Sequence, residues 1–127
     1  MMCDNSDVQN SFTQNDFDLL YSDVCEKFLN RNNVEIIRKN SKEALESFPD
    51  KYFDWIYIDA SHNYDDVLND LELSRLKLKK NGSIVGDDYV NAVGKWGNDV
   101  IRAVNEFSKK YSLHVDSINN QFIIKLP

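Results

Sequence analysis

The chain has 127 residues, of which 42% are hydrophobic and 12% aromatic, enough for the packed core of a globular domain. Its 21 acidic residues against 15 lysines and arginines give a formal net charge of −6, which disfavours nucleic-acid binding, and no apolar run approaches the roughly 20 residues of a membrane-spanning helix. Two cysteines are too few for a disulfide framework and the N-terminus lacks the pattern of a signal peptide, so we expect a cytoplasmic protein with reduced thiols.

The first sixteen residues are polar and predict a loop, with a strand stub at their start. Apolar residues then recur at steps of three and four over residues 17–28, which predicts a helix with Asp16 as N-cap or first-turn acid. The β-rich run at residues 34–38 predicts a short strand, and the segment opening at Ser41 predicts a short helix that ends at Pro49.

Residues 53–59 read FDWIYID and are apolar on both faces, which predicts a central strand of a parallel sheet, with its aromatic side chains in the core rather than stacked on a ligand. A second helix, capped by Asn63 or Ser61, should stop at the sequence KKNG, where residues 81–82 reverse the chain. The run SIVGDD predicts another buried strand, and the apolar spacing over residues 100–111 predicts a third helix.

Two β-rich runs flank Asn119 and Asn120 and predict an antiparallel hairpin from about Leu113 to Leu126. Strands and helices alternate upstream of this hairpin. The sequence therefore predicts an α/β fold with a Rossmann-like, mostly parallel sheet and a C-terminal antiparallel hairpin.

Three carboxylates follow two of the predicted strands. Asp59 ends one strand, and Asp87 and Asp88 end the next. Because ligands bind at the carboxyl ends of such strands, and neighbouring strands lie about 5 Å apart, the three could share one hard cation such as Mg²⁺. A metal would lower the pKa of a bound acceptor hydroxyl, and His62 could accept its proton.

Each of these residues also has a plain structural interpretation. Asp59 could cap the following helix, the pair Asp87–Asp88 could be a solvated turn, and His62 could serve a turn or a cap. Asp4 could be a surface acid and Asn40 a loop residue that satisfies its own backbone.

The segment FDWIYIDASHNYDDVLNDLELSRLKLKKNGSIVGDDY resembles the second half of the catalytic domain of class I S-adenosylmethionine-dependent methyltransferases. The pattern is an apolar strand ending in Asp-x-x-His, a Leu-rich helix, a glycine turn and a strand ending in Gly-Asp-Asp-Tyr. It is similar to the family that includes macrocin O-methyltransferase-like enzymes. The resemblance covers roughly residues 34–107, and the turn reads Lys80-Asn81-Gly82 where that family has Lys-x-Gly-Gly.

The resemblance implies a metal-assisted O-methyltransferase that acts on a small hydroxylated acceptor, with S-adenosylmethionine as donor and Mg²⁺ as a candidate cofactor. It implies that Asp59, Asp87 and Asp88 hold the metal and that His62 is the catalytic base. The donor-binding positions that it implies are Asp4 at the ribose, Asn40 at the adenine edge, Ser41 and Asp59.

One departure from the family lies near the N-terminus. All four glycines lie at Gly82 or later, so the Gly-x-Gly loop that the family places before its ribose-binding acid is absent, as is its opening strand. We therefore expect residues 1–127 to form a single, partial domain. The alternatives are that a second copy or a partner chain completes the sheet, or that the protein no longer methylates.

Two other functional classes compete with this interpretation. One is a non-catalytic protein that uses the truncated fold for partner binding. The other is a response-regulator receiver domain, whose order of acidic motifs is the reverse of the order here. A donor-binding titration distinguishes the first of these from an enzyme.

Overall fold

The structure is a computed structural model in which residues 12–90 and 97–127 are described. The chain divides into two compact units, Met1–Arg38 and Lys39–Pro127. Asp4 and the strand predicted at the start of the chain lie outside the described residues. In the described part of the chain, no helix combines the length and apolar character needed to cross a bilayer.

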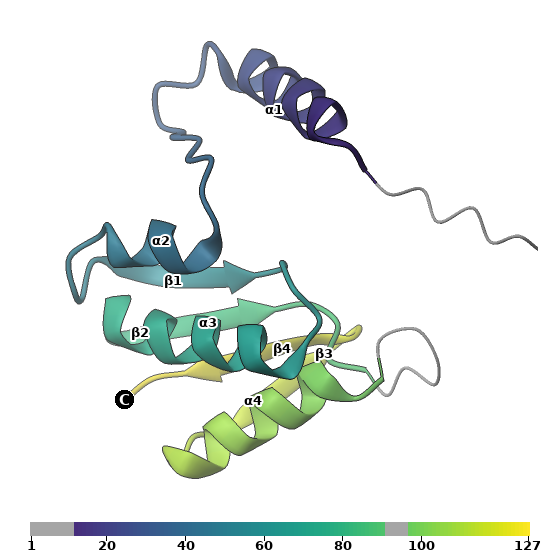
Figure 1. Cartoon of the computed structure of the whole chain (residues 1–127). Coiled ribbons are helices and arrows are strands. Elements are labelled where there is room, and N and C mark those ends of the chain that lie inside the picture. The colour runs from purple at the N-terminus through teal and green to yellow at the C-terminus, as the bar shows by residue number, and fades with distance from the viewer. Residues whose placement is uncertain (1–11, 91–96) are drawn as a thin grey trace, which may run out of the picture. The chain divides into compact units, whose positions relative to one another are not determined.

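The first unit contains helix α1 (Gln14–Phe28) (Figure 1). Thr13 caps it: the Thr13 hydroxyl accepts a hydrogen bond from the Asp16 amide at 3.3 Å, and the Asp16 carboxylate accepts one from the Thr13 amide at 2.7 Å. This reciprocal arrangement satisfies two amides that a helix start otherwise leaves unpaired. The predicted helix is confirmed, with Asp16 as its first-turn acid and Thr13 as its cap.

The strand predicted at residues 34–38 is wrong, because the structure gives this segment no regular secondary structure. A strand exists only through hydrogen bonds to a neighbouring strand, and the four-stranded sheet of the described residues does not include this segment. The predicted short helix is α2 (Ser41–Glu46), and its cap is Asn40, whose side-chain oxygen accepts from the Glu43 amide at 2.9 Å.

The second unit is built on one mixed sheet with the strand order β1-β2-β4-β3. Strands β1 (Phe53–Ile58) and β2 (Leu78–Gly86) are parallel, whereas β4 (Gln121–Lys125) is antiparallel to both β2 and β3 (Val115–Ile118). The α/β class and the C-terminal hairpin are therefore confirmed. The sheet is mixed rather than mostly parallel, because only one of its three strand pairs is parallel.

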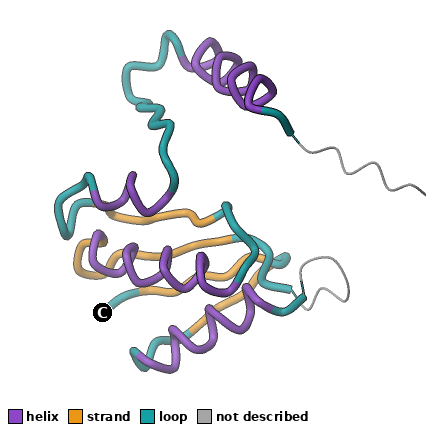
Figure 2. Tube along the Cα trace, viewed as in Figure 1, coloured by secondary structure: helices purple, strands orange, loops and turns teal. Residues whose placement is uncertain are grey.

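Helices α3 (Tyr64–Lys77) and α4 (Asp99–Lys110) lie side by side on one face of the sheet (Figures 1 and 2). The core lies between these helices and the sheet, and α4 buries one apolar face there. The largest fully buried hydrophobic side chains of this core are Phe107, Phe122, Leu71, Ile84, Ile124 and Val104. This single layer of helices fixes the strands, and with them the loops that follow β1 and β2.

Strand β1 lies at an edge of the described sheet, not at its centre. Ile58 faces the core and is buried, whereas Trp55 and Tyr57 alternate with it on the other face and are 62% and 41% exposed. The prediction that both aromatic side chains belong to the core is therefore wrong. An apolar run on both faces indicates a fully covered strand, but α3 and α4 cover only one face here.

Asn63 caps α3 through its side-chain oxygen, which accepts from the Asp66 amide at 3.0 Å, so Asp59 does not serve as that cap. The reversal predicted at residues 81–82 is a bulge within β2. Asn81 has a left-handed φ of 63°, and the pairing with β1 shifts register around it.

The hairpin turn depends on two left-handed residues, Asn119 (φ 49°) and Asn120 (φ 64°). Asparagine tolerates this conformation better than residues without a short polar side chain. We expect Asn120→Ala to lower the free energy of unfolding by about 1–2 kcal/mol, the cost of a left-handed non-glycine residue. Asn120→Gly, which removes that cost, should match or exceed the wild type, and denaturant melts of both variants would measure the difference.

Candidate functional site

Asp59 and Asp87 directly follow the ends of the parallel strands β1 and β2. Ile58 pairs with Gly86 in the β1–β2 register, and the Asp87 amide donates to the Ile58 carbonyl oxygen at 3.1 Å. Asp59 and Asp87 each follow one member of this residue pair. The predicted adjacency of the two strand ends is therefore confirmed.

Gly86 lets the strands approach closely at this point. A Cβ atom on Gly86 would lie 2.4 Å from the Phe122 ring and 2.9 Å from the Ile58 carbonyl oxygen, which is closer than atoms pack. The glycine of the Gly-Asp-Asp sequence is thus required by packing against β4 and β1. It sets the position from which the two aspartates leave the sheet.

The side chains of His62 and Asp88 form a hydrogen-bonded pair at this end of the strands. The His62 Nε2 atom lies 2.6 Å from the Asp88 Oδ2 atom, and the two side chains are 31% and 34% exposed. Asp88 has a left-handed φ of 61°, and its amide donates to the Asp87 carboxylate at 2.9 Å. A left-handed non-glycine residue held by such contacts is a common feature of functional sites. The two partners are 26 positions apart in the sequence, so their pairing could not be predicted from it.

The side chain of Tyr57, predicted to lie in the core, instead lies near the three carboxylates. Its hydroxyl accepts a hydrogen bond from the Gln121 side chain at 2.7 Å. Partial burial raises the pKa of the Tyr57 hydroxyl, and the negative charges of Asp87, Asp59 and Asp88 raise it further. All three carboxylates therefore lie within electrostatic reach of one hydroxyl. Residues two apart in a strand point to the same face, so the spacing of Tyr57 and Asp59 indicated that their side chains lie on one side.

The described side chains of Asp59, Asp87 and Asp88 are not arranged to share one cation. Among residues 12–90 and 97–127, no group of three or more histidine, cysteine or acidic side chains is arranged to hold a metal ion. Asp88 instead binds His62, and one Asp87 oxygen accepts from the backbone. The predicted Mg²⁺ site finds no support in this arrangement of donors.

A cavity of about 540 Å³ lies next to the β1 edge. It is formed where the start of α2 meets the loop after β1 and the middle of α3. The residues that line it are Lys39, Asn40, Ser41, Lys42, Ala60, Ser61, Asp66, Asn69 and Asp70. Two predicted donor-binding residues, Asn40 and Ser41, therefore share one hollow with the residues that precede His62. Its volume falls in the range of small-molecule sites.

Asp70 is the buried acid of this cavity and was not identified from the sequence. Only 5% of its surface is exposed. Burial raises the pKa of the Asp70 carboxyl, while a hydrogen bond from Ser41 partly opposes the shift. Its apolar helical neighbours gave no indication of a buried acid, because the burial depends on α2 lying against α3.

The raised pKa of Asp70 predicts how its replacement affects stability. Above the ordinary value of 3.8, the unfolded carboxyl ionises first while the folded one resists, so this group lowers stability as pH rises. We expect Asp70→Asn to raise the melting temperature at pH 7 and to leave it unchanged near pH 3. Asp65→Asn, on an exposed residue of the same helix, is the control and should give no gain at pH 7.

Comparison with known proteins identifies the family. A family model described as a methyltransferase domain matches residues 2–89. Over 79 residues the chain is 34% identical to an uncharacterized protein of Acanthamoeba polyphaga mimivirus, an alignment that covers 58% of this chain and 34% of that protein. The chain thus matches about a third of that relative's length. The family match includes the cavity, Asp59, His62 and the Asp87–Asp88 pair, and covers more than half of the sequence: the chain belongs to the methyltransferase-domain family.

Proposed function

We propose that this chain transfers a methyl group from S-adenosylmethionine to a hydroxyl oxygen of a small acceptor. The observation that carries the proposal is the hydrogen-bonded pair of His62 and Asp88. It lies at the edge where Asp59 and Asp87 leave the sheet, in a chain of the methyltransferase-domain family. A histidine held by a carboxylate is well suited to act as the base in oxygen methylation.

The side chains of this edge suit that chemistry. The donor supplies a methyl group on a positively charged sulfur, and the acceptor oxygen forms its bond to that carbon as the carbon–sulfur bond breaks. His62 takes the hydroxyl proton, and Asp88 stabilises the resulting imidazolium. The negative charges of Asp59 and Asp87 favour the two cations of this reaction, the donor sulfonium and the His62 imidazolium. Because these three carboxylates are not arranged as metal ligands, no step is assigned to a metal.

The donor is proposed to occupy the cavity lined by Asn40, Ser41 and Asp70. The amide of Asn40 offers a donor and an acceptor for the edge of a purine, and Ser41 offers a hydroxyl. Asp59 is proposed as a further donor contact, while the ribose role of Asp4, outside the described residues, stays a prediction.

Calorimetric titration with S-adenosylmethionine tests this proposal. We expect the wild-type chain to bind the donor, and Asn40→Ala to weaken binding by about tenfold, the effect of losing roughly 1.4 kcal/mol of contacts. Asn40→Asp keeps the oxygen that caps α2 but loses the amide N–H groups, so it should weaken binding while preserving the helix.

Thr13→Ala is the matched control, because it removes the cap of α1 from the other compact unit. It should destabilise its own helix by about 1 kcal/mol and leave donor affinity unchanged. If the wild-type chain binds no donor, the enzymatic proposal fails and a binding role for the fold becomes the better account.

A further inference from the structure

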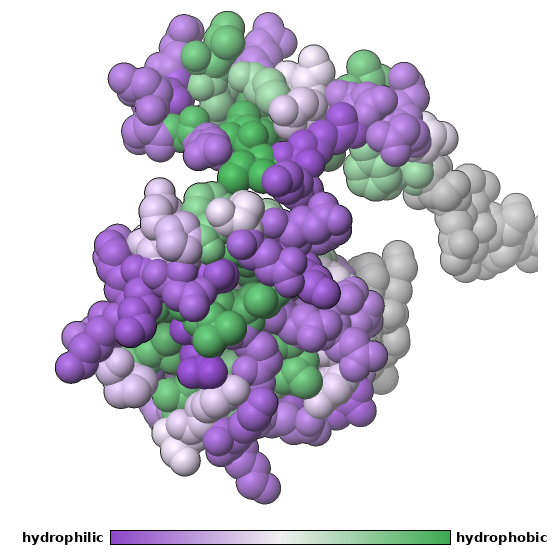
Figure 3. Space-filling model, turned by 60° about the vertical axis from the view of Figure 1, so that its left-hand side comes forward, coloured by the Kyte–Doolittle hydropathy of each residue, from purple (hydrophilic) through white to green (hydrophobic). Residues whose placement is uncertain are grey.

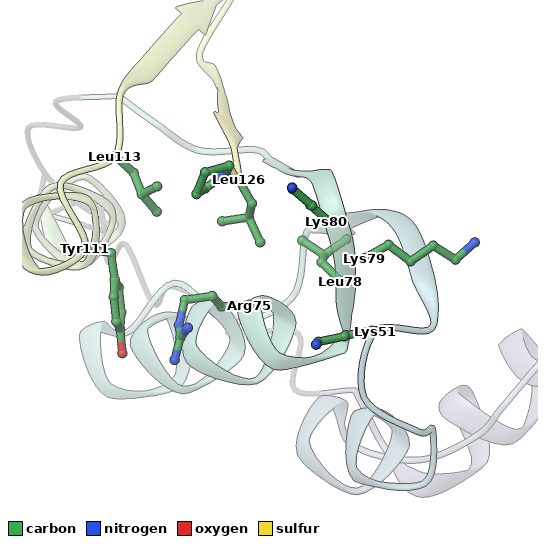
Figure 4. Close-up of a pocket in the computed structure, with 9 residues that line it drawn as sticks. Lys51, Arg75, Leu78, Lys79, Lys80, Tyr111, Leu113 and Leu126 are labelled. Atoms are coloured by element: carbon green, nitrogen blue, oxygen red, sulfur yellow. The ribbon is translucent and has the colours of Figure 1, made fainter.

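A second cavity, of about 520 Å³, lies where β2 begins, at the opposite end of that strand from Asp87. Figure 4 shows the side chains that line it. Leu78 begins β2 there, and Leu126 follows the antiparallel strand β4. The residues that line it are Lys51, Arg75, Leu78, Lys79, Lys80, Tyr111, Leu113, Leu126 and Pro127. It is therefore separate from the proposed methyl-transfer site.

The rim of this cavity is strongly basic although the chain is acidic. Four of its lining residues are lysine or arginine, and none is acidic, in a chain of net charge −6. Lys79 pairs with Asp54 at 2.8 Å and extends away from the other lining side chains (Figure 4). Within the described residues, no carboxylate forms an ion pair with Lys51, Arg75 or Lys80. Three cationic side chains of the cavity thus form no ion pair with a described carboxylate, although the Glu72 carboxylate lies within electrostatic reach of Arg75.

Arg75 is held in place with hydrogen-bonding capacity to spare. Its guanidinium stacks on the Tyr111 ring, 4.2 Å from the ring centre. The nearby Glu72 carboxylate is engaged by Lys110 at 2.7 Å and by the Tyr111 hydroxyl at 2.6 Å. The Arg75 Nε atom is buried and has no hydrogen-bond partner among the described residues. At least one N–H group of this stacked guanidinium therefore lacks an acceptor, and a guanidinium is suited to a planar anion.

Lys51 is positioned by strained backbone. Its φ is 57°, a left-handed value that lysine rarely adopts, and its amide donates to the Leu76 carbonyl oxygen at 3.1 Å. This hydrogen bond fixes the loop against the end of α3. Strain that places a cation on the rim of a cavity is a pointer to function.

The floor of the cavity is apolar. Leu78 and Leu126 are 3% and 9% exposed, and Leu113 packs against the same core. Figure 3 brings this side of the unit forward and shows apolar surface framed by hydrophilic residues. A ligand that uses both features has an anionic head and an apolar body, and the volume suits a small molecule.

We infer that this cavity is a second binding site, for a small amphipathic anion whose phosphate or carboxylate meets Arg75, Lys51 and Lys80 while its apolar body covers the leucines. The site does not depend on the proposed methyl transfer. Its ligand would act from the amino ends of the strands, as a regulator or as a second recognition element.

Phenyl phosphate, which carries an anionic head on an apolar ring, is the probe, and calorimetry is the measurement. We expect one-to-one binding that weakens with added salt, at least roughly tenfold tighter than inorganic phosphate or benzyl alcohol, because each of these has only half of the recognised features. Lys51→Ala and Lys80→Ala should each weaken binding roughly fivefold, and Arg75→Gln by more.

Lys79→Ala is the matched control, since its side chain turns away from the cavity and pairs with Asp54. It should leave affinity unchanged, as should Asn40→Ala in the other cavity. The inference is overturned if phenyl phosphate does not bind, if Lys79→Ala weakens binding as much as Lys80→Ala, or if S-adenosylmethionine competes with the probe. Because Lys51 and Lys80 are exposed, their variants should fold even if Arg75→Gln does not.

Discussion

Replacement of His62 by alanine should lower the rate of methyl transfer by about 10²- to 10⁴-fold, the usual contribution of a general base. His62 is the group at the strand edge that would carry the acceptor proton, and Asp88 holds it at 2.6 Å. Donor affinity should change little, because the loss falls on kcat. Transfer of radiolabelled methyl from S-adenosylmethionine to a panel of hydroxylated acceptors would measure it.

The chain offers a matched control for this experiment. His114 is the other of its two histidines, and it also pairs with an aspartate, Asp116, at 3.0 Å on the surface. His114→Ala should leave methyl transfer intact. If His62→Ala and His114→Ala retain equal activity, the assignment of the base is wrong, although the family assignment stands.

Asp88 should behave as a positioning residue in the same assay. Asp88→Asn retains a side chain that tolerates the left-handed φ of 61° but removes the charge that stabilises a protonated His62. We therefore expect a lower kcat with little change in donor affinity. A purely structural role would instead lower the melting temperature and weaken donor binding together.

Features determined by neighbouring residues were predictable from the sequence. The turn at Asn119 and Asn120 and the start of α2 at Ser41 follow from side chains that hydrogen-bond or adopt left-handed backbone locally. The adjacency of Asp59 and Asp87 was predictable because parallel strands bring their carboxyl ends to one edge.

Features that depend on distant partners were not predictable. Residues 34–38 have the composition of a strand, but no strand of the described sheet pairs with them. Trp55 has the hydrophobicity of a core residue, but its burial depends on what covers that face of the sheet. The His62–Asp88 pair depends on the left-handed turn at Asp88, which composition does not specify.

Gly86→Ala is expected to destabilise the second unit and to disturb the site together. The added methyl group would lie 2.4 Å from the Phe122 ring, and Phe122 is fully buried in the core. Overpacking of this kind typically costs about 1–3 kcal/mol, measured as a lower midpoint of denaturant unfolding. Because Gly86 precedes the pair Asp87–Asp88, relief of the clash would shift both carboxylates, so methyl transfer should fall even in the folded fraction.

A second substitution separates steric overlap from other causes. Phe122→Leu removes the ring that the new methyl group meets, so the double variant Gly86→Ala/Phe122→Leu should lose less stability than the sum of the single losses. The contact with the Ile58 carbonyl oxygen at 2.9 Å remains, so recovery should be partial. Strictly additive losses would show that Gly86 and Phe122 do not interact, and that the glycine is required for another reason.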